Sequence, residues 1–363
     1  MKILSIGYKS ADQGGPFNVE QNYIKVLQRK NIKVVRETYT LKKIFKILML
    51  KKNFFVDYIN EFDLVHFHAV FSISNALISK LLFKNHIPYI ISLHGNLNNW
   101  SMNQSKLKKL IFLKFFQSYI LKSQAIHVLN DFEKNEVSNI IDLKKLRIFK
   151  LQNCIDVPKY KITKSSSKVK FTVLFFGRLN LKKGIYRLLN IIKLLKKNSI
   201  NDIKFLFVGP KDLSIYKDFL SKIESLKLTK IIEIRDSVQT LEDKKKLFSE
   251  CDIFILPSDD EADSVSLKEA LSAGLPVIIS KNCKFEFTKD AIQFVKVIDN
   301  NDLNHYVDAI LEFYQNYQNL NSLAIKAHTY SSLHFSLKEI EVFLPEVYYD
   351  CLTYSFKSKN WYS

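Results

Sequence analysis

The chain contains few of the residues that crosslink, break or bend polypeptides. Its 363 residues include 4 cysteines, 7 prolines and 8 glycines. The cysteines are scattered without a paired spacing, so neither a zinc site nor a disulfide framework is predicted. No run approaches 18 apolar residues free of charge, which argues against a bilayer-spanning helix. The opening apolar run ends at Gly7 and is too short for a signal peptide, so we expect a cytoplasmic protein.

The residues that are abundant are apolar and basic. Hydrophobic residues make up 47% of the chain and charged residues 25%, as in an ordered globular protein. The formal net charge is +19, and residues 1–160 carry 25 Lys and Arg against 11 Asp and Glu. Such asymmetry indicates a polyanionic partner, either an anionic membrane surface or a nucleic acid. The alternative is a lysine-rich composition on a solvated face.

Apolar runs of strand length alternate with helix-length segments along the whole chain. This rhythm predicts an α/β fold with parallel sheets. A polar connector at residues 160–170 divides the rhythm into two sets, which predicts two Rossmann-like domains. The expected strands are 2–7, 32–38, 63–69, 88–95, 125–130 and 147–153 in the first set, and 171–177, 203–209, 230–236, 251–258 and 275–280 in the second.

Glycine placement predicts where a ligand binds. All glycines except Gly274 lie at the C-terminal end of an expected strand, in the loop after it or at the start of the next helix. Ligands of open α/β sheets bind beyond the carboxyl ends of the strands, where backbone must approach phosphate closely. The sequence therefore predicts a phosphate-binding cleft.

Two glycine-containing loops suit a phosphate ligand. Gly14 and Gly15 in "DQGGPFNVEQ" can direct backbone N–H groups at an anion, but the third glycine of a dinucleotide fingerprint is lacking, which disfavours NAD. In "FFGRLNLKKGIYRLL", Arg178 and Lys183 flank the start of a helix and suit a diphosphate. The alternative is that both cations are solvated, like the neighbouring Lys182.

Two glutamates, Glu261 and Glu269, lie eight positions apart in "SDDEADSVSLKEALSAG". The first belongs to the loop after a buried strand and the second lies about one turn into the next helix. Carboxylates near a helix N-terminus are favoured by the helix dipole, and ionised carboxylates accept hydrogen bonds from sugar hydroxyls. On spacing alone, two acids that merely stabilise the helix remain an alternative.

In this order the motifs resemble the retaining, family-4 type of group 1 glycosyltransferases. The matching stretches are "GGP", "HGN", "NCID", "GRLNLKKG", "FVGP" and "LPSDDEADSVSLKEALSAGLPVI", and they run over nearly the whole chain. The resemblance implies a GT-B fold with two facing Rossmann-like domains. Residues 1–160 would bind the acceptor, residues 161–335 the nucleotide-sugar donor, and a C-terminal helix in 336–363 would return to the first domain.

The resemblance also implies roles for single residues. Arg178 and Lys183 would bind the diphosphate of the donor and stabilise it as the leaving group. Glu269 would hold the ribose hydroxyls, and Glu261 would hold the hydroxyls of the transferred sugar. Without a metal or another cofactor, fixed cations must meet the developing negative charge.

Further implied site residues come from both halves. Gly14 and Gly15 would offer N–H groups to the distal phosphate, and His94 would lie at the reaction centre. Ser264 and Val265, at the start of the helix that carries Glu269, would contact the donor.

Some features depart from the family pattern or allow another interpretation. Ala262, Asp263 and Ser264 replace the usual Gly-Phe-Gly-like element, and the charge of Asp263 makes the donor identity uncertain.

His66 and His68 share one face of a strand, but no third ligand follows in sequence, so a crevice or core role is favoured over a metal site.

We therefore expect an enzyme that moves a sugar from a nucleotide diphosphate-sugar to a glycan or undecaprenyl-linked acceptor. Synthesis of a bacterial surface polysaccharide, such as capsule, O-antigen or exopolysaccharide, at the inner face of the cell membrane fits this activity. The lysine-rich segments 41–55 and 107–122 are as compatible with partly buried helices as with interfacial ones. The alternatives are a nucleotide-sugar epimerase of the same fold and a basic membrane- or nucleic-acid-binding protein without catalysis. No nucleic-acid-binding signature is present, so a nucleic acid is not an expected partner.

Overall fold

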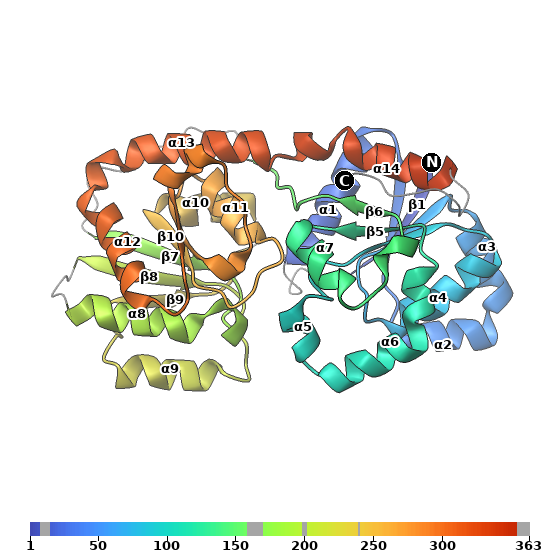
Figure 1. The fold of residues 1–363 in the computed structure, drawn as a ribbon, viewed down its shortest axis with the longest axis horizontal. Coiled ribbons are helices and arrows are strands. Elements are labelled where there is room, and N and C mark those ends of the chain that lie inside the picture. The colour runs from blue at the N-terminus through green and yellow to red at the C-terminus, as the bar shows by residue number, and fades with distance from the viewer. Residues whose placement is uncertain (8–14, 158–169, 198–201, 239, 354–363) are drawn as a thin grey trace. The chain divides into compact units, whose positions relative to one another are not determined.

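The computed structural model describes residues 1–7, 15–157, 170–197, 202–238 and 240–353. The chain divides into two compact units, Met1–Cys154 with Leu337–Ser363, and Ile155–Ser336. Each unit is built on its own six-stranded sheet (Figure 1). The predicted α/β fold class with two Rossmann-like halves is therefore confirmed. The predicted domain boundary at residues 160 and 161 lies outside the described residues.

The first unit has an entirely parallel sheet in the order β2-β1-β3-β4-β5-β6. Because β1 lies between β2 and β3, the direction of winding changes there, and the carboxyl ends of β1 and β3 flank the switch point. Strands β3, β4 and β5 are buried along their whole length, as expected for the centre of a parallel sheet. The strands are β1 Lys2–Ile6, β2 Lys33–Glu37, β3 Leu64–Phe67, β4 Tyr89–Ser92, β5 Ala125–Val128 and β6 Ile148–Lys150.

The helices of the first unit connect these strands, and the C-terminal segment joins them. In this unit α14 packs beside α1 (Figure 1), and Arg29 at the end of α1 forms an ion pair with Glu341. The helices are α1 Gly15–Arg29, α2 Leu41–Leu50, α3 Lys52–Asn60, α4 Ile73–Lys84, α5 Asn99–Asn103, α6 Lys106–Leu121, α7 Asp131–Ser138 and α14 Phe343–Thr353, with short 3₁₀ helices at Leu143–Lys145 and Leu337–Ile340.

The second unit repeats the plan with a parallel sheet in the order β12-β11-β10-β7-β8-β9. This is the strand order of a dinucleotide-binding Rossmann sheet, with the switch point between β7 and β10. All the strands expected from the sequence occur, and an additional edge strand, β12, was not predicted. The strands are β7 Phe171–Phe176, β8 Ile203–Val208, β9 Ile232–Arg235, β10 Ile253–Leu256, β11 Val277–Ser280 and β12 Val295–Ile298.

Helices also connect the strands of the second unit. Helix α12 packs on α8, and α13 packs on α11. The α-helices are α8 Ile185–Lys197, α9 Tyr216–Ser225, α10 Leu241–Ser249, α11 Val265–Ser272, α12 Leu303–Gln315 and α13 Leu320–His334. The 3₁₀ helices are η3 Leu181–Lys183, η4 Lys281–Cys283, η5 Lys289–Gln293 and η6 Tyr317–Asn319.

Two boundaries differ from the sequence-based expectations. The loop "DQGGPFNVEQ" predicts a helix that opens at about Phe17, but α1 begins at Gly15, two residues earlier. The C-terminal helix expected from residue 336 begins at Phe343 as α14, because Phe335 and Ser336 run beside Ile155 and Leu337–Ile340 form a 3₁₀ helix. The amide of Ile155 donates to the carbonyl of Phe335 at 2.8 Å.

Candidate functional site

The switch point of the second sheet is formed by the loops that follow β7 and β10. Gly184 has φ +71°, and a Cβ there would lie 1.9 Å from the carbonyl oxygen of Pro257. Gly209 after β8 approaches Gly177 in the same way, since its Cβ would lie 2.1 Å from the Gly177 carbonyl oxygen. These backbones therefore pack at distances that only glycine permits. This edge of the sheet is where an α/β fold binds its ligand.

Three ion pairs connect the loop after β10 to the segment that follows β7. Lys183 Nζ lies 2.8 Å from Glu261 Oε1, and Lys182 Nζ lies 2.9 Å from Asp260 Oδ2. Arg187, in the first turn of α8, contacts the Asp259 carboxylate at 2.7 Å. Neither Lys182 nor Lys183 is a solvated side chain, since they are 23% and 20% exposed.

In the sequence, the acidic run Asp259, Asp260 and Glu261 is the motif that competes with a metal-free mechanism, and the same pairs bear on it. Asp260 also contacts Lys284 at 2.7 Å, so it lies between two lysines. Carboxylates neutralised by ammonium groups are poor ligands for a divalent cation, which would have to displace those charges. Within the described residues, no group of three or more His, Cys, Asp or Glu side chains is placed to hold a metal.

Glu261 is buried, with 7% of the residue exposed, and is therefore not a surface acid. Its Oε1 also accepts a hydrogen bond from Ser258 Oγ at 2.7 Å, and its backbone amide donates to the Asn282 carbonyl. Burial raises the pKa of the nearby Cys283 thiol, and the negative charge of Glu261 adds to this rise. Cys283 is thus an inert packing residue beneath the carboxylate.

Glu269 lies in α11 and pairs with a lysine from a neighbouring helix. Lys244 Nζ of α10 lies 2.6 Å from Glu269 Oε1, and the two side chains are 17% and 18% exposed. Ser264 caps the N-terminus of α11 by accepting from the Leu267 amide, and Val265 is the first residue of that helix. Glu269 therefore belongs to the same carboxyl edge as Glu261, one turn into the helix as the sequence predicts.

Asp263 forms an inward ion pair. Lys268 Nζ lies 2.7 Å from the Asp263 carboxylate. The side chain of Lys268 is 0% exposed and that of Asp263 is 4% exposed. The ammonium also lies 5.3 Å from the ring of Phe285 and 5.1 Å from that of Phe335. The negative charge of Asp263, which departs from the family pattern, is therefore neutralised by Lys268 within the second unit.

Arg178 follows Gly177 directly and its side chain is exposed. Lys183 is the last residue of η3, whose start is capped by Asn180, and Gly184 then ends the turn in a left-handed conformation before α8 begins. The sequence predicts that Lys183 and Gly184 start the next helix, whereas α8 begins at Ile185, directly after them. Both cations still lie in the loop after β7.

The switch point of the first sheet gathers histidines from three strands. Tyr348 of α14 contacts His66 Nδ1 at 2.5 Å, His66 Nε2 contacts Ser92 Oγ at 2.7 Å, and Ser92 Oγ contacts His127 Nδ1 at 2.7 Å. His127 Nε2 donates to the Leu151 carbonyl at 2.6 Å. Burial lowers the pKa of His66 and His127, so each ring is neutral at pH 7 and donates from one nitrogen only. Because the Leu151 carbonyl only accepts, His127 donates to it from Nε2 and accepts from Ser92 Oγ at Nδ1.

His94 and His68 lie beside this chain. His94 Nε2 is 3.2 Å from His68 Nδ1, and the two rings are stacked with centroids 5.5 Å apart. Burial lowers the pKa of His94 to about 3 and that of His127 to about 4. Burial also lowers the pKa of His66 and His68. The cluster is therefore neutral at pH 7 and consists of buried polar side chains at the strand ends.

Gly15 opens α1 at the same edge of the first sheet, and Gly14 lies outside the described residues. Gly7 ends β1, and a Cβ there would lie 2.0 Å from the buried carboxylate of Glu20. Glu20 in turn accepts from Ser5 Oγ at 2.8 Å and pairs with Arg36 at 3.1 Å. None of these last contacts was expected from the sequence.

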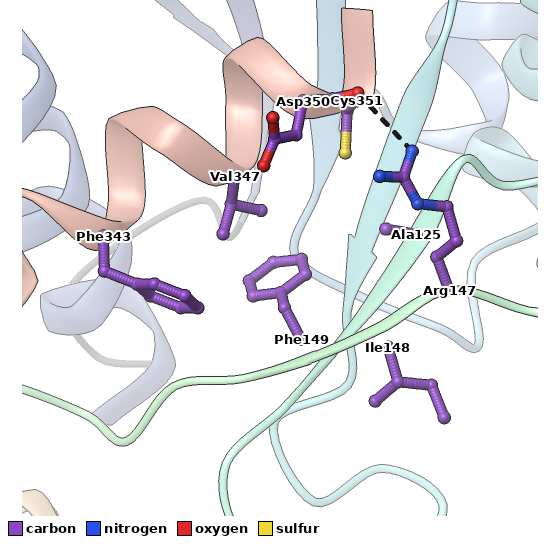
Figure 2. A pocket seen from close by; sticks show the side chains of 8 residues that line it. All are labelled: Ala125, Arg147, Ile148, Phe149, Phe343, Val347, Asp350 and Cys351. Atoms are coloured by element: carbon purple, nitrogen blue, oxygen red, sulfur yellow. Dashed lines mark hydrogen bonds between the residues drawn. The ribbon is translucent and has the colours of Figure 1, made fainter. Parts of the chain in front are cut away.

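A separate pocket lies where α14 packs against β5 and β6 of the first unit (Figure 2). The lining of the pocket is largely apolar. Arg147 is turned toward Asp350, and its Nη1 donates to the Asp350 carbonyl oxygen at 3.4 Å. Since its lining side chains pack a helix onto the sheet, the pocket belongs to the core of the unit and not to the ligand edge.

Two family models match consecutive parts of the chain. "Glycosyltransferase Family 4" matches residues 10–158, and "Glycosyl transferases group 1" matches residues 157–329. The chain is a group 1 glycosyltransferase of the GT-B type. No curated protein gives a significant match to the sequence of this glycosyltransferase.

Solved structures share the fold of this glycosyltransferase at low sequence identity. HepE from Anabaena, in complex with UDP and glucose, is 16% identical, with a TM-score of 0.74 over 96% of this chain and 100% of that one. Sucrose-phosphate synthase from Thermosynechococcus elongatus is 13% identical, with a TM-score of 0.76 over 98% and 100%. The apo lipopolysaccharide outer core galactosyltransferase WaaB is 16% identical, with a TM-score of 0.61 over 94% and 99%.

The partners of the predicted site residues of this glycosyltransferase were missed at the sequence level. Lys244, Ser258, Lys268 and Lys284 lie between 3 and 25 residues from the acids they contact, and no short motif marks them. The opposite charges of segment 182–187, which is basic, and segment 259–263, which is acidic, indicate only the pairs between those two segments.

Proposed function

We propose that the glycosyltransferase moves a sugar, with retention of configuration, from a UDP-sugar to a glycan or lipid-linked acceptor. The observation that carries this proposal is the pairing of Glu261 with Lys183 and of Glu269 with Lys244 at one switch point. Each pair holds a carboxylate that can accept from sugar hydroxyls next to an ammonium that can meet a phosphate. The UDP and glucose bound by HepE support the choice of donor.

Charge at this site can be redistributed when a donor binds. A diphosphate that reaches Lys183 and Arg178 competes with Glu261 for the Lys183 ammonium, and sugar hydroxyls then compensate the carboxylate. As the bond from the sugar to the diphosphate breaks, negative charge grows on the leaving oxygen and the fixed cations stabilise it. We propose that Arg178 and Lys183 act in this step, that Glu261 holds the transferred sugar, and that Glu269 holds the ribose.

The donor proposal is tested by calorimetric titration of the full chain with UDP, GDP and their glucose, galactose and N-acetylglucosamine derivatives. We expect one UDP-sugar to bind and, with an acceptor lysate fraction, to yield UDP and a glycoside. Proton NMR of the product then tests retention through the anomeric coupling constant. Conversion of the UDP-sugar to its epimer without an acceptor would favour an epimerase instead.

We further propose that the first unit binds an anionic membrane surface through α2 and the start of α3. The basic apolar patch there consists of Phe45, Met49, Leu50 and Phe54 together with neighbouring lysines. Met49 is 81% exposed, Leu50 71% and Phe54 72%, and only Ile44 of α2 is buried. The lysines are Lys42, Lys43, Lys46, Lys51 and Lys52, and all of them are exposed.

Exposed apolar side chains surrounded by lysines fit the boundary between lipid headgroups and acyl chains, since both burial and charge favour binding. No helix among the described residues is long and apolar enough to cross a membrane. A lipid-linked or membrane-bound glycan acceptor in surface polysaccharide synthesis fits such a surface. WaaB, a lipopolysaccharide outer core galactosyltransferase, supports this class of acceptor.

Vesicle sedimentation tests the membrane proposal. We expect binding to vesicles that contain phosphatidylglycerol and little binding to pure phosphatidylcholine, with a loss of about tenfold for the double variant Met49→Gln and Phe54→Gln. Leu213→Gln is the matched control, because Leu213 is an 84% exposed apolar residue of the second unit. Equal loss in the control and the double variant would contradict the patch assignment.

A further inference from the structure

A buried glutamate in the first unit connects the loops that follow β4 and β5. Glu133, in the first turn of α7, is 1% exposed. Its Oε1 accepts from the Gly95 amide at 2.6 Å, and its Oε2 accepts from the Leu129 amide at 2.7 Å. Its own amide donates to Asn130 Oδ1 at 2.8 Å, which fixes the start of the helix. Two short bonds from backbone amides to one buried carboxylate make a strong and directional link.

The link holds a stretch of unusual backbone. His94 has φ +48° and Gly95 has φ +73°, so two successive residues are left-handed. A non-glycine residue in this conformation is strained and persists only where its surroundings determine it. The Glu133 carboxylate is bound to the amide that directly follows His94, so it acts on the residue whose backbone is strained.

This conformation determines where the His94 ring lies. The ring stacks on His68 and lies edge-on to His127, with centroids 6.0 Å apart. Glu133 reaches the loop through the backbone amides of Gly95 and Leu129. A shift of the loop would therefore move the His94 ring at the carboxyl edge of the sheet, and the imidazole itself would stay chemically unchanged.

We propose that Glu133 is a positioning residue for sugar transfer, which fixes the ring of His94 through the Gly95 amide. The inference rests on the proposed function and on the place of His94 at the reaction centre, which the family resemblance implies. Displacement of a reacting group by about 1 Å can cost about 100-fold in rate, so a residue of this kind affects turnover more than donor binding.

The experiment combines Glu133→Gln, His94→Ala and the double variant in the full chain. We expect Glu133→Gln to lower kcat about 30- to 100-fold with the donor KM within about twofold, because the amide cannot accept from both N–H groups. In the His94→Ala background the same change should cost less than about threefold, since the residue that it positions is absent. Asp131→Asn is the matched control, because Asp131 lies in the same helical turn but forms an exposed ion pair with Lys150.

A second measurement does not depend on activity. In amide hydrogen exchange followed by NMR, the Gly95 amide should lose protection in Glu133→Gln and Glu133→Asp, and the Asp131→Asn protein should match the wild type. Equal kcat losses from Glu133→Gln with and without His94, or an unchanged kcat in a folded Glu133→Gln enzyme, would overturn the inference. A wild-type protein that transfers no sugar would instead overturn the proposed function.

Discussion

Removing one partner of the buried pair between Lys268 and Asp263 should destabilise the second unit strongly. Lys268→Met deletes the ammonium but keeps the length of the side chain, which lies between Phe285 and Phe335. The Asp263 carboxylate, with 4% of its side chain exposed, then loses the cation that lies 2.7 Å away. An uncompensated buried charge costs about 3–5 kcal/mol.

The second unit spans residues 155–336, so this loss corresponds to a fall of about 6–20 °C in its Tm. The double variant Lys268→Met with Asp263→Asn removes both charges and should recover most of the loss, because apolar or neutral replacements of a buried pair are often close to neutral. Recovery is the result that distinguishes a lost ion pair from a lost packing contact.

Differential scanning calorimetry of the full chain measures both changes. Lys245→Met serves as the control, since Lys245 is 46% exposed and forms a 4.0 Å pair with Glu242 on the surface, where little change is expected. A Lys268→Met protein that melts within about 2 °C of the wild type would refute the reasoning. So would a double variant that is less stable than both single variants.

Three further predictions concern the site and its pH dependence. Lys183→Ala should lower turnover by about 100-fold or more while Lys193→Ala on the exposed side of α8 does not, as measured by UDP release. Glu269→Ala should weaken calorimetric UDP binding, whereas Glu261→Ala should leave it nearly intact and lower turnover; equal losses of UDP binding would refute this division. Burial lowers the folded-state pKa of His127 to about 4, below the ordinary value of about 6.5, so the unfolded chain takes up the proton first. Stability should therefore be full above about pH 6.5 and fall toward pH 4, and this decline should be shallower in His127→Gln when thermal melts are compared across that range; an unchanged slope would contradict it.

Much of the fold was predictable because it depends on local pattern. Buried parallel strands are short apolar runs, and the segments between them have helical length, so the alternation appeared directly in the chain. The edge strand β12 was missed because only Val295 of its four residues is buried and because it carries Lys296. The start of α14 at Phe343 instead of 336 was missed because the chain there is held by Ile155, whose amide donates to Phe335, 180 residues away in the sequence.

The sequence by itself determined which segments follow the strand ends where we propose the site, since the glycines, the loop of Arg178 and Lys183 and the spacing of Glu261 and Glu269 follow the order of the strands. Tertiary structure alone decided the partner of each charge. Lys183 reaches Glu261 across 78 residues because β7 and β10 are neighbours at the switch point, and Lys244 reaches Glu269 because α10 and α11 flank β10. Such pairs depend on which strand ends meet at one edge, and that is a property of the folded sheet and not of any local stretch of sequence.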